Sequence, residues 1–272
     1  MPVDPQLRTL DIEIPTQPEV LVKLSLLMAA EDIDLLAMSS LVESDMALAA
    51  AVLKAVNSSL YGLRGRVQTV HQALTYLGMR EVAAITFEMG LRAAFPTAPE
   101  LDPIWGRASR RGLMMGRMGQ MLGVDPWAAH SAGLFEECGK AVLYRHASAH
   151  YPAMLRAAPN DQELVQLEHT AFGVSHDALG AALCESWGLA PAAVANVRHH
   201  VEVQQTLLMP ETLQRRSVAA ISAMAWAMLN APERMEEVAQ AIAPQAQIDE
   251  NMMLRAARRV AEQLTQAEEH GR

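Results

Sequence analysis

Residues 105–118, WGRASRRGLMMGRM, decide the fold class because their apolar and small side chains recur on one helical face. The positions on this face are Trp105, Ala108, Gly112, Met115 and Met118. They follow one another at steps of three or four residues, which is the period of an α-helix rather than the alternation of a strand. The same spacing recurs along nearly the whole chain, and no run of alternating β-branched residues interrupts it. The sequence therefore predicts an all-α protein.

The composition favours closely packed helices and limits the partners. Of 272 residues, 51% are apolar, only 4% are aromatic and 17 are Met, so aliphatic side chains and Met must build the core. The 22 Lys and Arg against 31 Asp and Glu give a net charge of −9, which argues against nucleic-acid binding. The uncharged stretch 217–232 is shorter than the roughly 20 apolar residues of a membrane-spanning helix.

The chain start and the cysteines indicate the compartment. The N-terminal residues lack the basic start and apolar core of a secretory signal, so a cytoplasmic protein with no membrane association is expected. Cys138 and Cys184 are too few for a disulfide framework and are expected to remain reduced thiols.

Prolines and glycines suggest where the chain divides. The segment 95–103, FPTAPELDP, holds three prolines and breaks the helical pattern, so it is the predicted junction between two helical halves. In chain order, the sequence predicts an N-terminal extension, 1–11; a domain, 12–205, with halves 12–95 and 103–205; and additional C-terminal helices, 206–272.

Short motifs occur in a distinctive order. The first half contains Pro18-Glu19-Val20, Glu43-Ser44-Asp45, Asn57-Ser58, Tyr61-Gly62 and Leu77-Gly78. The second half contains Trp105, GLFEECGK at 133–140, FGVSH at 172–176, WGL at 187–189 and VRHH at 197–200. Over roughly residues 12–202, this order closely resembles the HDOD family. HDOD domains look like degenerate relatives of the HD metal-dependent phosphohydrolases, and the family is known as a bacterial signalling output module. The resemblance therefore implies a role in signalling.

The resemblance also implies that the HD chemistry is absent. It places Glu136 and Glu137 where an HD enzyme has its His-Asp pair, and Arg107 near the position of an upstream histidine ligand. A guanidinium is always charged and cannot ligate a metal. We therefore expect no catalytic residue, no metal and no other cofactor. The degenerate HD-site positions are Arg107, Glu136, Glu137, His176, His199 and His200.

The surviving histidines leave an alternative open. His176, His199 and His200, with Glu136 or Glu137, are ligand types that bind Zn²⁺, which would give a metal-dependent phosphohydrolase or a nucleotide sensor. Neighbouring residues on a helix point about 100° apart, so at most one of His199 and His200 packs inward. The simpler interpretation makes that residue a hydrogen-bonded core histidine.

The two glutamates have two interpretations as well. Adjacent carboxylates on a helix are more often a solvated edge than an acid-base pair, and that interpretation is preferred here. If one of them points into the degenerate pocket, Arg107 is its natural partner, and a salt bridge would replace the metal.

Basic residues cluster on the same segment. Arg107, Arg110, Arg111 and Arg117 form a candidate site for an anion or an acidic partner, and Arg107 with Arg110 would serve a nucleotide sensor. A scattered, solvated surface explains the same pattern and is favoured.

Taken together, the sequence predicts a non-enzymatic, all-α signalling module that binds another protein. The partner is an unidentified signalling protein, docked along the junction between the halves and on the C-terminal helices. Residues 233–272 are a candidate for self-association. No nucleic acid or membrane is expected. A cyclic dinucleotide stays an open alternative that no motif supports.

Overall fold

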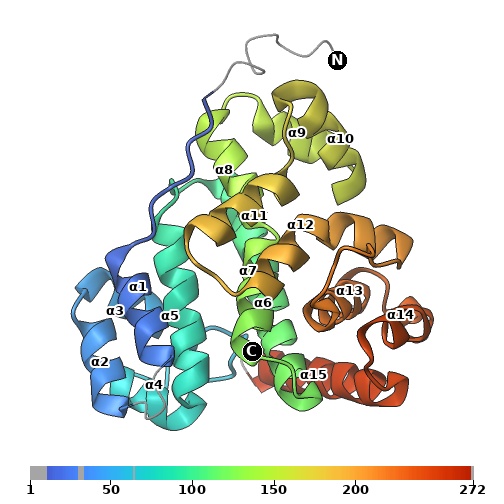
Figure 1. Cartoon of the computed structure of the whole chain (residues 1–272). Coiled ribbons are helices and arrows are strands. Elements are labelled where there is room, and N and C mark those ends of the chain that lie inside the picture. The colour runs from blue at the N-terminus through green and yellow to red at the C-terminus, as the bar shows by residue number, and fades with distance from the viewer. Residues whose placement is uncertain (1–10, 30–33, 64, 271–272) are drawn as a thin grey trace. The chain divides into compact units, whose positions relative to one another are not determined.

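The computed structural model describes residues 11–29, 34–63 and 65–270 (Figure 1). Every regular element in these ranges is a helix, which confirms the predicted all-α class. The predicted extension 1–11 lies outside these ranges except for Asp11. Among the described residues, no single helix is long and apolar enough to span a membrane, although the pair α2 (Leu35–Glu43) and α3 (Met46–Val56), bent by 113°, passes that test together.

The contacts group the chain into two compact units. Unit 1 comprises Met1–Pro15 and Phe95–Arg259, and unit 2 comprises Thr16–Ala94 and Val260–Arg272. The division between Ala94 and Phe95 lies at the start of the proline-containing segment. The C-terminal segment from residue 206 to Arg259 belongs to unit 1, and Val260–Arg272 belongs to unit 2.

Unit 2 is a small helical bundle in which three of the described helices begin at side-chain caps. Asp34, Asp45 and Thr69 each accept hydrogen bonds from backbone amides in the first turn of the helix that follows. Gly90 packs against Leu21, since a Cβ atom on Gly90 would lie 2.5 Å from a Leu21 methyl carbon. The helices are α1 (Glu19–Met28), α2 (Leu35–Glu43), α3 (Met46–Val56), α4 (Val70–Leu77) and α5 (Met79–Ala93).

Unit 1 is built around the long helix α6 and the helices packed on it. The predicted stripe of α6 is buried along its whole length, as the helical spacing requires. The helices are α6 (Asp102–Leu122), α7 (Pro126–Phe135), α8 (Cys138–His146), α9 (Tyr151–Ala157), α10 (Asp161–Phe172), α11 (His176–Ser186), α12 (Pro191–Thr206), α13 (Arg216–Asn230) and α14 (Met235–Ile242). Short 3₁₀ turns lie at Pro99–Leu101, Pro232–Arg234 and Pro244–Ala246, and α15 (Glu250–His270) contributes to both units.

Glycines set the closest helix approaches in unit 1. A Cβ on Gly133 of α7 would lie 2.9 Å from the Cα of Gly112, so α6 and α7 meet at backbone distance. A Cβ on Gly139 of α8 would lie 1.8 Å from the carbonyl oxygen of His176, where α11 begins. These two approaches bring the turn between α7 and α8 deep into the core.

Candidate functional site

Glu136 occupies the turn that separates α7 from α8, and its side chain is fully buried. Its Oε1 atom accepts hydrogen bonds from Asn196 Nδ2 at 2.7 Å and Ser222 Oγ at 2.6 Å. Its Oε2 atom accepts from Arg111 Nη1 at 2.7 Å and Gln204 Nε2 at 3.1 Å. An ionised carboxylate has about four acceptor positions. Side chains from α6, α12 and α13 therefore fill them all.

Glu137 is also fully buried and faces three cations. Arg107 donates from Nη2 to Oε2 at 3.0 Å, Lys140 Nζ donates to the same oxygen at 3.1 Å, and Arg111 Nη1 lies 3.5 Å from Oε1. Burial acts to raise the pKa of Glu137, but the charges of Lys140, Arg111 and Arg107 outweigh it and lower the pKa to about 2. Lys140 continues the chain of ion pairs to Asp161 Oδ1 at 2.7 Å. We call the six residues joined in this way the ion cluster: Arg107, Arg111, Glu136, Glu137, Lys140 and Asp161.

The preferred expectation of a solvated edge is therefore wrong for both glutamates. They lie in a turn rather than on an open helix face, and the close approach of α8 to α11 carries that turn into the core. Arg107 does pair with Glu137, as the alternative interpretation required. Arg111, expected in a surface patch, is instead the 3% exposed partner of Glu136. A buried carboxylate needs a counterion, and α6 supplies it from beside its apolar stripe.

Beside the ion cluster, the rings of His176 and His200 lie 5.7 Å apart and are buried. His176 Nδ1 lies 2.7 Å from Glu168 Oε2, and the same carboxylate accepts from the His176 backbone amide. The hydroxyl of Tyr151 donates to the other oxygen of Glu168. His200 Nδ1 lies 2.8 Å from the carbonyl oxygen of Val197. In each histidine, the contact at Nδ1 thus fixes the orientation of the imidazole ring.

His199 is not part of this arrangement. It is partly exposed and its Nδ1 lies 3.6 Å from Glu202 on the same helix, so only His200 of the adjacent pair points inward. Asp161, which was not among the predicted site residues, contributes a carboxylate oxygen within 4.8 Å of a ring nitrogen of His176 and of His200. In the sequence it reads as an ordinary acidic residue in the first turn of a helix, after the Asn160 cap. No sequence signal separates it from such a residue.

The family match covers the whole of this region. The pattern of the HDOD domain matches residues 14–203, which include the ion cluster and both buried histidines. The chain belongs to the HDOD domain family.

Known relatives and structures agree with this fold. An HDOD domain protein of unknown function from Geobacter sulfurreducens superposes with a TM-score of 0.71 at 18% identity, covering 96% of this chain and 94% of that one. A protein from Shewanella amazonensis SB2B, provisionally named a phosphohydrolase, gives 0.68 at 22% identity, with 94% and 93% covered. A protein from Marinobacter aquaeolei VT8, provisionally named a signal transduction protein, gives 0.71 at 22%, with 96% and 60% covered.

One relative is similar in sequence over most of this chain. An uncharacterized protein of Treponema pallidum (strain Nichols) is 27% identical over 197 residues. The match covers 69% of this chain and 37% of that protein, so this HDOD chain spans little more than a third of the relative's length.

The four arginines of α6 do not form one open basic patch in this HDOD domain. Arg107 and Arg111 are directed to Glu137 and Glu136, and Arg111 is inaccessible to a ligand. Arg110 is exposed and Arg117 is half-buried. A shared anion site would need all of these groups to face solvent, which the ion cluster prevents.

A cavity of about 350 Å³ adjoins the ion cluster. Arg107, Glu137, Lys140 and Asp161 line it together with Trp226 of α13. The indole of Trp226 offers no metal ligand, because its N–H group is a donor only. The cavity is therefore a charged hollow whose groups are largely paired with one another.

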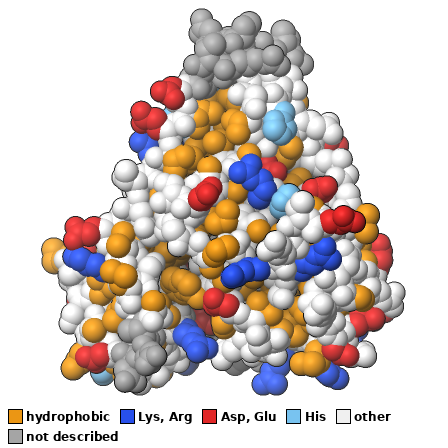
Figure 2. Space-filling view, viewed as in Figure 1, with side chains coloured by type: hydrophobic (Ala, Val, Ile, Leu, Met, Phe, Trp, Pro, Cys, Tyr) orange, Lys and Arg blue, Asp and Glu red, His pale blue; other side chains and the backbone are white. Residues whose placement is uncertain are grey.

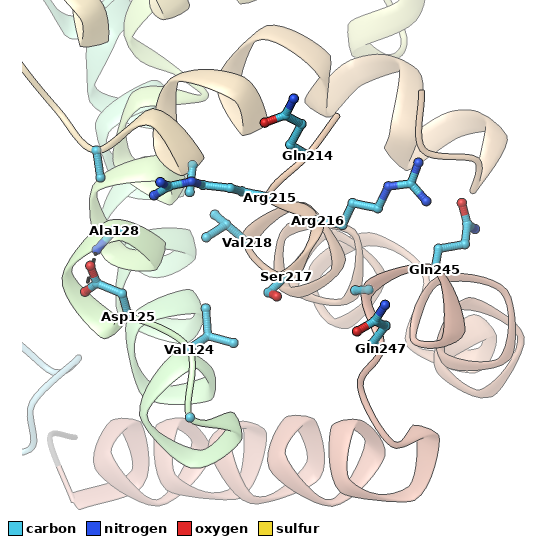
Figure 3. Close-up of a pocket in the computed structure, with 14 residues that line it drawn as sticks. Val124, Asp125, Ala128, Gln214, Arg215, Arg216, Ser217, Val218, Gln245 and Gln247 are labelled. Atoms are coloured by element: carbon cyan, nitrogen blue, oxygen red, sulfur yellow. Dashed lines mark hydrogen bonds between the residues drawn. The ribbon is translucent and has the colours of Figure 1, made fainter. Parts of the chain in front are cut away.

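A second cavity of about 460 Å³ lies elsewhere in unit 1 (Figure 3). Gln214, Arg215 and Ser217 line it near the start of α13, and Gln247 lines it beyond α14. Asp125 also lines it, but its carboxylate caps α7 by accepting from the amides of residues 127 and 128. This hollow is polar and is distinct from the HD-related positions.

The shifted pKa of Glu137 predicts a specific loss of stability in acid. A carboxyl group whose pKa falls from 4.5 in the unfolded chain to about 2 in the folded one stabilises the fold above pH 4.5, and this contribution disappears as the pH approaches 2. The free energy of unfolding of Glu137→Gln should thus lie below that of the unmodified protein at pH 7, with the gap narrowing below pH 4.5. Urea denaturation at a series of pH values measures the gap.

The exposed Glu211 provides the matched control. Glu211→Gln should follow the unmodified protein at every pH. A gap for Glu137→Gln that stays constant from pH 7 to pH 3 would contradict the role assigned to the Glu137 charge.

Proposed function

We propose that this HDOD domain is a non-enzymatic signal-transduction module in which ion pairs replace the metal centre of an HD phosphohydrolase. The observation that carries the proposal is the burial of Glu136 with every acceptor position occupied by a protein donor. An HD enzyme needs ligands that converge on divalent ions and leave room for water and a phosphate oxygen. At the position of Glu136 and Glu137, the guanidinium groups of Arg111 and Arg107 would repel such an ion.

Membership of the HDOD family and the similarity to a protein provisionally named a signal transduction protein support the signalling role. Without catalysis, a signal has to leave the module by binding. We infer a protein partner rather than a nucleic acid, because the chain carries a net charge of −9.

Exposed apolar side chains supply a candidate surface for that partner. Leu26 on α1 is 70% exposed and Leu36 on α2 is 69% exposed, while Val22 and Leu35 on the same two helices are about half exposed. These helices pack together. Apolar side chains also reach the surface among charged ones on the face in Figure 2. We propose that the partner contacts these exposed apolar side chains of α1 and α2. The docking surfaces expected at the junction between the halves and on the C-terminal helices stay predictions, and so does self-association through residues 233–272.

The absence of catalysis is tested by phosphodiester hydrolysis. Protein supplied with Mn²⁺ or Fe²⁺ should hydrolyse cyclic dinucleotides and bis(p-nitrophenyl) phosphate no faster than the metal ions alone, with an active HD phosphohydrolase as positive control. Turnover that needs the metal and disappears in His200→Ala would overturn the proposal.

The partner surface is tested by proximity labelling in the cells that produce the protein. The double variant Leu26→Glu/Leu36→Glu should keep the thermal unfolding midpoint of the unmodified protein, because both side chains are exposed. It should label the specific partners at least ten-fold less than the unmodified protein does. Leu208→Glu, which changes a 66% exposed leucine of unit 1, should retain it. Equal labelling in the two variants would move the surface away from α1 and α2.

A further inference from the structure

Three helices bring ligand atoms to one buried point beside the ion cluster. Asp161 begins α10, His176 begins α11, and His200 lies in α12. One carboxylate oxygen and one ring nitrogen from each histidine all lie within 4.8 Å of one another. Ligand atoms bonded to a tetrahedral ion at about 2.1 Å are roughly 3.4 Å apart. Small side-chain rotations would therefore bring the three ligand atoms to the spacing that one ion needs. We propose that Asp161, His176 and His200 bind one divalent transition-metal ion.

The second nitrogen of each ring supports this assignment. The carbonyl oxygen of Val197 can only accept, so Nδ1 of His200 carries the proton and its Nε2 presents a lone pair. Glu168 accepts at Nδ1 of His176 in the same way. A metal-binding histidine almost always donates its other N–H to a carboxylate or a carbonyl, which fixes the tautomer and orients the ring. Both imidazoles have this arrangement.

The two Nε2 atoms are buried and have no hydrogen-bond partner among the described residues. A buried polar atom that lacks a partner costs about 1–3 kcal/mol, so such atoms are rare unless something satisfies them. These two histidines are also the ones that offer a ring nitrogen within 4.8 Å of a carboxylate oxygen of Asp161. One ion would satisfy both nitrogens at once.

Glu168 makes the arrangement rigid. It is completely buried and is held by the Tyr151 hydroxyl and by the backbone amide of His176 as well as by the imidazole. Its oxygens are therefore occupied, so it acts as a positioning residue for His176 and not as a ligand.

With both histidines in the neutral form that binds metal ions, the charged groups around this point sum to one negative charge, because four carboxylates face three basic groups. These groups are Glu136, Glu137, Asp161 and Glu168, against Arg107, Arg111 and Lys140. Lys140 binds Asp161 through Oδ1, so Oδ2 remains for the ion.

The ligand types narrow the identity of the ion. Two imidazoles and one carboxylate suit Zn²⁺ or Fe²⁺ better than Ca²⁺, which prefers oxygen ligands. The side chain of Asp161 is 31% exposed and lines the 350 Å³ cavity, so a water molecule could complete the coordination from that side. The site differs from an HD centre, because neither Glu136 nor Glu137 contributes a ligand.

The experiment uses the full chain, free of any histidine tag and stripped with a chelator. Isothermal titration with Zn²⁺, checked by metal analysis after dialysis, should give one bound equivalent. His200→Ala should weaken binding at least 100-fold, whereas His199→Ala, its neighbour on the same helix but outside the set, should bind as the unmodified protein does. Glu168→Gln should weaken binding by about 10–100-fold through the orientation of His176.

Far-ultraviolet circular dichroism and a second variant, His200→Gln, show whether a loss of binding reflects misfolding. A folded His200→Gln that binds Zn²⁺ as tightly as the unmodified protein would overturn the proposal. So would the absence of a stoichiometric Zn²⁺ ion, or an equal loss in His199→Ala. Binding without hydrolysis leaves the proposed function intact, whereas metal-dependent hydrolysis would overturn that function and support the site.

Discussion

Replacing Glu136 with Gln is expected to lower the free energy of unfolding by about 3–5 kcal/mol. The substitution leaves the shape of the side chain but removes the charge that Arg111 pairs with at 2.7 Å in a fully buried position. The new amide NH₂ group would also face the donor groups of Asn196 and Ser222, which would then lack an acceptor. Removing one partner of a buried pair leaves the other charge uncompensated, and that penalty dominates. Urea denaturation followed by circular dichroism measures the change.

A double variant separates this penalty from simple loss of packing. Glu136→Leu/Arg111→Met removes both charges, and it should recover more than half of the stability that Glu136→Gln loses, because apolar side chains of similar size often replace buried ion pairs well. Glu211→Gln, at an exposed position, should change the free energy of unfolding by less than about 0.5 kcal/mol. If Glu136→Gln is equally mild, Glu136 is not the buried centre of the ion cluster.

Gly139→Ala is expected to destabilise the fold by at least about 3 kcal/mol or to prevent folding, which is the upper end for overpacking. The added methyl carbon would lie 1.8 Å from the carbonyl oxygen of His176 and 2.9 Å from the backbone nitrogen of Gly180. Both contacts are with backbone, so no side-chain rotation relieves them, and α8 must move away from α11. The yield of folded protein and its thermal unfolding midpoint measure the effect.

Gly106→Ala is the matched control for this substitution. Gly106 lies within α6, and a Cβ there would meet nothing within 4 Å. Alanine favours a helix interior over glycine by up to about 1 kcal/mol, so this variant should be as stable as the unmodified protein or slightly more stable. If Gly139→Ala has the same thermal unfolding midpoint as the unmodified protein, α8 and α11 are not in backbone contact.

The helices of this protein could be predicted from the sequence because their signal is local. The stripe from Trp105 to Met118 repeats at the helical period, and each of its members is buried in α6. The adjacent pair His199 and His200 likewise behaved as helical geometry requires, with one imidazole inside and one partly exposed. Period and capping are properties of neighbouring residues, so one sequence contains them.

The ion cluster could be predicted only in part, because distant segments create it. Glu136 is buried by residues 25 to 86 positions away in the chain, among them Arg111 and Ser222. The local sequence does not contain those partners, so two adjacent glutamates predict a solvent-exposed edge of a helix. Asp161 was missed for the same reason, since its meeting with His176 and His200 depends on how three helices pack. Resemblance to the HDOD family located the right segment, but not the burial of its charges.

The central claim is that ion pairs occupy the position of the HD metal centre. The most direct test is a crystal structure of the protein grown with Mn²⁺ or Zn²⁺, in which anomalous scattering locates each bound ion. We expect no ion within bonding distance of Glu136 or Glu137, and we expect their carboxylates to remain paired with Arg111 and Arg107. An ion coordinated by Glu136 and Glu137, with Arg111 displaced from its carboxylate, would contradict the claim.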